Sequence, residues 1–90
     1  MNKLNGVCVM PVAAYILVNV AVGRIQSVID KLKEIEGVRV VSFTAGQYDV
    51  IVRVEVETLE DLFYLTERIH EIEGIERTNT HVVEKEIGSL

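Results

Sequence analysis

The alternation of hydrophobic and polar residues predicts four strands along this chain. Residues 13–22 are apolar on both faces of an extended chain except at Asn19, which is typical of a strand in the middle of a sheet. Residues 38–44 and 48–57 are rich in β-branched residues and predict two further strands. Residues 75–86 predict a last strand, which is more polar and is therefore expected at a sheet edge.

Two amphipathic helices are predicted between these strands. The first follows Gly23, and its apolar residues recur at helical spacing up to Gly37, where we expect it to end because glycine readily adopts the left-handed conformation there. The second is expected to start at Thr58, a good N-cap with Asp61 three residues later, and to end at Gly74. The sequences EIEGV and EIEGI end the two predicted helices, so the chain consists of two similar halves.

Two strand–helix–strand units joined by a hairpin predict an α+β fold, the ferredoxin-like βαββαβ sandwich. Its four-stranded antiparallel sheet carries both helices on one face. Residues 1–12 show no clear period, and Pro11 would interrupt pairing in a central strand. We therefore expect residues 1–12 to be an N-terminal tail or short extension and residues 13–90 to be the domain, with Met10 as an alternative start.

Composition indicates that this domain associates with other chains. The 90 residues are 49% hydrophobic, and the single cysteine, Cys8, excludes an internal disulfide. One core of this size supplies only ~3–5 kcal/mol, so the excess apolar surface is expected to be buried between subunits, through the uncovered face of the sheet. A net charge of −5 argues against a nucleic-acid-binding surface.

The apolar run at residues 7–22 is interrupted by Pro11 and Asn19. It is also shorter than the ~20 apolar residues of a membrane-spanning helix. We therefore expect no signal peptide or membrane anchor, and a soluble cytoplasmic protein.

The turn between the second and third predicted strands holds the best candidates for a binding site: Gly46, Gln47, Tyr48 and Asp49. The Asp49 carboxylate could pair with a cationic group of a ligand, or it could bond the backbone of its own turn. Backbone amides near Gly46 could receive a carboxylate, and Tyr48 could contact a ligand or simply pack.

Other candidates lie near the end of the chain. Thr78 and Thr80 fall on one face of the last strand and could line a shared pocket, although threonines are ordinary strand residues. His70 and His81 lack the further His or Cys residues that a metal site requires, so we expect neither a metal nor a cofactor. No nucleophile–base pair is evident, so no catalytic residue is named and no enzyme activity is expected.

The segment from residue 13 to 86 resembles the effector-binding domain of the Lrp/AsnC transcription regulators, also called the RAM domain. The most specific parts are the Gly46-Gln47-Tyr48-Asp49 turn with its valine-rich strand, and Gly74-Ile75 followed by Thr78-Asn79-Thr80. The resemblance implies homodimers formed through the sheets, further assembly into tetramers to octamers, and a free amino acid bound as effector between dimers.

Nothing before Ala13 is long enough to form the helix-turn-helix domain of most family members, which implies a stand-alone form without DNA binding of its own. Such a chain would sense a metabolite or co-assemble with full-length Lrp/AsnC regulators. A ligand-independent assembly partner is the second hypothesis. A small enzyme on the same fold, similar to a dimeric monooxygenase or an acylphosphatase, is the third and is disfavoured.

Overall fold

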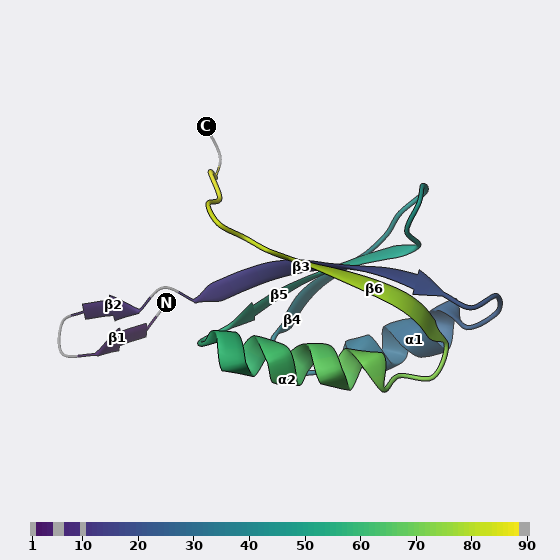
Figure 1. The fold of residues 1–90 in the computed structure, drawn as a ribbon, viewed down its shortest axis with the longest axis horizontal. Helices are drawn as coiled ribbons and strands as arrows, with labels where there is room; N and C mark the ends of the chain where they lie inside the picture. The colour runs from purple at the N-terminus through teal and green to yellow at the C-terminus, as the bar shows by residue number, and fades with distance from the viewer. Residues whose placement is uncertain (1, 5–6, 10, 89–90) are drawn as a thin grey trace.

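The protein forms a four-stranded sheet with two helices packed on one of its faces (Figure 1). The structure is a computed structural model and describes residues 2–4, 7–9 and 11–88. Its elements are β1 (Asn2–Leu4), β2 (Val7–Val9), β3 (Val12–Val20), α1 (Ile25–Leu32), β4 (Val38–Phe43), β5 (Val50–Val56), α2 (Leu59–His70) and β6 (Ile75–Val82).

The strand order in the large sheet is β4-β5-β3-β6, and every neighbouring pair is antiparallel. The predicted ferredoxin-like βαββαβ arrangement is confirmed. The apolar strand β3 lies inside the sheet and the polar strand β6 lies at its edge, as their patterns predict. Strand β3 therefore pairs with both halves of the chain, which places the β4–β5 turn and the start of β6 at the same end of the sheet.

The core lies between the sheet and the helices, because alternate strand residues point to opposite faces. Ile16 and Val52 are paired on the face that the helices cover and are almost completely buried. Their neighbours Leu17 and Ile51 are paired on the other face and remain half-buried. We call this second surface the open face. The other core residues are Ala14, Val18, Val20, Val28, Ile29, Leu32, Ile35, Val50, Val54, Leu62, Leu65 and Ile69.

The two halves of the chain have the same kind of turn between helix and strand, next to Gly37 and Gly74. After each helix a tight turn leads into the next strand, with Val38 N donating to Ile35 O at 3.2 Å and Ile75 N donating to Ile72 O at 3.3 Å. Gly37 O then accepts a hydrogen bond from Glu55 N at 2.9 Å. The structure thus reproduces the repeat that the EIEGV and EIEGI sequences predict.

Several predicted boundaries are wrong by a few residues. The helices end at Leu32 and His70 rather than at the glycines, because the chain tightens into turns such as Ile35 N to Leu32 O, at 3.1 Å. The last strand ends at Val82 rather than at residue 86. Strand β6 pairs with β3, which begins at Val12. The residues near 86 therefore lie past the start of β3 and have no strand to pair with.

The N-terminal strands β1 and β2 pair with each other as a separate two-stranded sheet. Strand β3 starts directly after Pro11, which agrees with the expectation that proline does not enter the central pairing. Met10, the alternative start, lies outside the described residues. No helix in the described parts of the chain is long and apolar enough to cross a membrane.

Candidate functional site

The β4–β5 turn, residues 44–49, is tied together by its own backbone. Thr44 N donates to Asp49 O at 3.0 Å, and the Thr44 hydroxyl donates to Tyr48 O at 2.7 Å. Gly46 has a φ of +153°, which L side chains rarely adopt, and no atom lies within 4 Å of the position of a Cβ. The turn is therefore open at its tip.

Asp49 fastens this turn to the neighbouring strand β3. Its backbone N donates to Val18 O at 3.0 Å, and its carboxylate Oδ2 accepts a hydrogen bond from Val20 N at 2.8 Å. The carboxylate therefore bonds backbone, although on β3 rather than within its own turn. Its second oxygen, Oδ1, has no hydrogen-bond partner among the described residues and stays free for a cation.

Tyr48 and Gln47 join a polar cluster on the open face. Asn79 Nδ2 donates to the Tyr48 hydroxyl at 3.4 Å. The Asn19 amide lies between Gln47 O, at 3.0 Å, and Arg77 Nη2, at 3.3 Å, and both contacts are satisfied when Nδ2 points toward Gln47. Sequence analysis did not select Asn19, Arg77 or Asn79 for the site. The signal was present in Asn19, the one polar residue in an apolar strand.

Thr78 and Thr80 lie on the opposite side of the sheet from this cluster. They pair with Val18 and Ile16, which point into the core, so their side chains are on the helix-covered face. The Thr78 hydroxyl contacts His70 Nε2 on α2. One chain therefore brings Gly46, Gln47, Tyr48 and Asp49 together, but it does not bring the two threonines to them.

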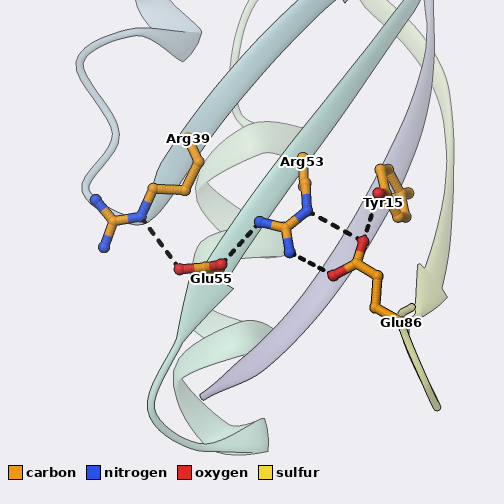
Figure 2. Close-up of polar contacts among 5 residues, drawn as sticks. All are labelled: Tyr15, Arg39, Arg53, Glu55 and Glu86. Atoms are coloured by element: carbon orange, nitrogen blue, oxygen red, sulfur yellow. Dashed lines mark hydrogen bonds and ion pairs between the residues drawn. The ribbon is translucent and has the colours of Figure 1, made fainter. Parts of the chain in front are cut away.

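A second polar group on the open face is centred on Arg53 (Figure 2). Arg53 Nη1 donates to Glu55 Oε2 at 2.8 Å, and Arg53 Nη2 donates to Glu86 Oε1 at 2.7 Å. Glu86 Oε2 also accepts the Tyr15 hydroxyl at 2.7 Å, and Arg39 lies 3.7 Å from Glu55. We call these five residues the Arg53 network. Charges on a strand are usually solvated, yet Arg53 and Glu55 pair with each other here, and Arg53 also pairs with Glu86.

Acid is expected to destabilise the protein through the Arg53 network. Hydrogen bonds from Arg53 lower the pKa of Glu55, and those from Arg53 and Tyr15 lower the pKa of Glu86. A carboxyl with a lower pKa in the folded state stabilises that state above its unfolded pKa, and the contribution is lost as the pH falls through the folded value. We therefore expect stability to decline between roughly pH 5 and pH 3.

Urea denaturation across this pH range would measure the decline. Arg53→Met should flatten the pH dependence, because both carboxyls then titrate closer to their ordinary values. An unchanged pH slope in Arg53→Met would show that other carboxyls cause the acid sensitivity.

A cleft of about 520 Å³ lies at the other end of the sheet from the 44–49 turn. It opens where β5 ends and α2 begins, near the pairing of Val12 with Val56, and it contains none of the predicted site residues. The cleft is lined by Pro11, Ile35, Glu36, Gly37, Arg39, Glu55, Val56, Glu57, Asp61, Tyr64, Leu65 and Arg68.

Comparison with known proteins agrees with the fold. The profile of the Lrp/AsnC ligand binding domain matches residues 13–89. The HTH-type transcriptional regulator FL11 of Pyrococcus furiosus is 32% identical over 74 residues, which cover 82% of this chain and 49% of that protein. The chain thus spans about half the length of the curated relatives it matches.

Solved structures show the same domain. The crystal structure of FFRP-DM1 superposes with a TM-score of 0.75 at 37% identity, over 80% of this chain and 97% of that one. A feast or famine regulatory protein of M. tuberculosis, solved in complex with L-methionine, shares the fold with a TM-score of 0.73 at 21% identity, over 87% of this chain and 53% of that one.

These relatives are transcription regulators rather than enzymes, which agrees with the expectation that the domain is not catalytic. The family profile covers residues 13–89 of the 90-residue chain. Several curated regulators are more than 30% identical to the chain over the matched residues. The chain therefore belongs to the Lrp/AsnC ligand-binding domain family.

Proposed function

We propose that this domain binds a free amino acid as an effector, at a site formed between copies of the chain in the cytoplasm. The observation that carries the proposal is the state of Asp49. One carboxylate oxygen is held by Val20 N at 2.8 Å, which fixes the side chain, while Oδ1 has no partner in the part of the chain that the structure describes. A fixed carboxylate with a free oxygen is suited to an ammonium group.

The remaining groups of the proposed site come from two copies. Backbone amides near Gly46 of one copy and the hydroxyl of Thr78 or Thr80 of another would hold the effector carboxylate. Within one chain the threonines and the turn lie on opposite faces of the sheet, so a single copy supplies only half of this set. A small-molecule site normally buries ~70–90% of its ligand, which an open turn cannot do alone.

The M. tuberculosis relative is described in complex with L-methionine, which supports an amino acid as the ligand class. The proposed assembly is a homodimer through the open face, with further association to a tetramer or octamer. In this proposal the domain associates with full-length Lrp/AsnC regulators and modulates them.

A thermal-shift screen of the proteinogenic amino acids tests the proposal. At a concentration 100 times Kd, a ligand that binds only the folded state adds about 2.7 kcal/mol, which should raise Tm by roughly 10 °C or more for a domain of this size. Asp49→Asn removes the charge but keeps an oxygen for Val20 N, and it should lose the response. Asp30→Asn on the exposed side of α1 is the matched control and should respond like the wild type.

The proposal fails if no amino acid stabilises the wild type, or if Asp49→Asn responds as strongly as Asp30→Asn. Native mass spectrometry tests the assembly separately and also detects a carried ligand. A wild-type chain that stays monomeric at every concentration would contradict a site formed between copies.

A ligand-independent assembly partner is the second candidate function. The bond from Val20 N to the Asp49 carboxylate favours it, because this contact explains the aspartate without any effector. In that case the purified domain would form mixed oligomers with a full-length Lrp/AsnC regulator in the absence of amino acids. Native mass spectrometry of the mixture distinguishes the two functions, because the first requires an effector to alter the complexes.

A further inference from the structure

The C-terminal segment after β6 reaches back over the open face of the sheet. Beyond Val82 the chain leaves the sheet on the side opposite the helices (Figure 1). It places Glu86 against Arg53 of β5 and Tyr15 of β3, two residues that pair with each other on the open face. Glu86 thus adds a side chain from this segment to a surface that is otherwise made by the strands and the 44–49 turn.

Glu86 completes the hydrogen bonding of Arg53. Nη1 of the guanidinium donates to Glu55, whereas Nη2 and Nε both donate to Glu86, at 2.7 and 3.5 Å. The guanidinium also lies over the Tyr15 ring, 5.9 Å from its centroid. Without Glu86, two of the three guanidinium nitrogens would lose their partners.

Glu86 also balances the charge of the open face at this place. The Arg53 network holds two arginines, Arg39 and Arg53, and two glutamates, Glu55 and Glu86, so its net charge is zero. Neutralising Glu86 would leave one positive charge in excess. The Arg53 side chain is 23% exposed, so water can replace the lost carboxylate only in part.

Between the Arg53 network and the polar cluster of Asn19 and Tyr48, the centre of the open face is apolar. Leu17 and Ile51 are paired at its centre, and Val40 on β4, which pairs with Arg53, is 50% exposed. A sheet face of this kind can be buried against another only if its charges are paired, because an unpaired buried charge is costly. The Arg53 network satisfies that condition for its own four charges within a single chain.

We propose that Glu86 is an interface residue: by pairing Arg53 and cancelling its charge, the C-terminal segment prepares the open face to dock against a second copy of this chain. The inference rests on the proposed assembly through the open face and assigns to residues after β6 a role in it. A second copy is the occupant because the paired network needs no charge from its partner. Two copies of this network, each with no net charge, can therefore meet without like-charge repulsion.

The dimer dissociation constant of the full chain tests this inference, measured at neutral pH by sedimentation velocity over a dilution series. Glu86→Gln keeps the size of the side chain and removes its charge, and it should weaken the dimer at least tenfold, about 1.4 kcal/mol. Glu84→Gln is the matched control, since Glu84 lies on the same segment without a hydrogen bond or ion pair among the described residues. It should leave the dissociation constant within about twofold, less than the 0.6 kcal/mol of thermal energy.

Adding Arg53→Met to Glu86→Gln separates lost charge pairing from a loss of folding. The double variant has no unpaired guanidinium, so it should recover most of the affinity that Glu86→Gln loses. Circular dichroism of each variant would report whether it is folded. Recovery by a second substitution could not follow from general damage to the domain.

Equal dissociation constants for Glu86→Gln and Glu84→Gln would overturn the inference while leaving the proposed dimer intact. A tighter dimer in Glu86→Gln would overturn it as well, because the segment would then compete with the second copy. A wild-type chain that remains monomeric throughout would refute the proposed assembly itself, and this inference with it.

Discussion

Gly37→Ala is expected to lower the free energy of unfolding by ~2–5 kcal/mol. Gly37 has a φ of +101°, and a left-handed conformation costs an L residue ~1–2 kcal/mol. A Cβ there would lie 2.9 Å from Leu65 Cδ1 and 3.2 Å from Glu55 O. The carbonyl belongs to the backbone of β5, which cannot turn away, so crowding adds ~1–3 kcal/mol.

The expected loss is comparable with the ~3–5 kcal/mol that a core of this size supplies, so Gly37→Ala should be largely unfolded without a partner. Urea denaturation followed by circular dichroism would measure it. Gly23→Ala is the matched control, because Gly23 has a φ of +82° but no atom within 4 Å of a Cβ. It should cost only the conformational ~1–2 kcal/mol. Equal losses at Gly37 and Gly23 would show that the crowding is relieved by movement.

The fold could be predicted from the sequence because its local signals agree with one another. The apolar strand at 13–22, the polar strand at 75–86 and the repeated EIEG endings each pointed to the arrangement that the structure has. The boundaries could not be predicted as well. Ile35 continues the helical spacing of α1, yet its N–H bonds to Leu32 O in a tight turn. The change from helix to turn does not alter the pattern of apolar residues, so the pattern cannot predict it.

The candidate site was predicted only in part. The face on which the β6 side chains lie depends on the register between β6 and β3, which the sequence does not show. Thr78 lies opposite Val18, and the register shifts between Asn19 and Val20, so one residue of slippage decides which face the threonines occupy. Glu86 was equally hidden. Its partner Arg53 is 33 residues away in sequence, and the segment that carries Glu86 was expected to belong to the last strand, which ends at Val82.

The two threonines and the 44–49 turn lie on opposite faces of one chain, so each copy supplies only half of the proposed site. Had both sets met within one chain, a monomer could have enclosed an effector. Because they do not, effector binding and assembly are coupled in the proposed function, and each should raise the apparent affinity of the other. Variants of the open face would then weaken effector binding without touching Asp49.

Asp49→Ala is expected to destabilise the protein by ~1–3 kcal/mol even without any effector. The substitution removes the oxygen that accepts Val20 N at 2.8 Å, and Val20 is buried, so its N–H would be left without a partner. The contact also ties the 44–49 turn to β3, so hydrogen exchange should become faster in the turn as well. Thermal and urea denaturation in ligand-free buffer would measure the loss.

Asp49→Asn separates the structural role of this side chain from its proposed role in binding. Its amide oxygen can still accept the hydrogen bond from Val20 N, so it should be clearly more stable than Asp49→Ala, while the charge for an ammonium is gone. If Asp49→Asn is as unstable as Asp49→Ala, the negative charge itself holds the turn, and a lost effector response in Asp49→Asn would no longer identify a ligand contact. If it keeps its stability and loses the response, the charge of Asp49 acts on the effector rather than on the fold.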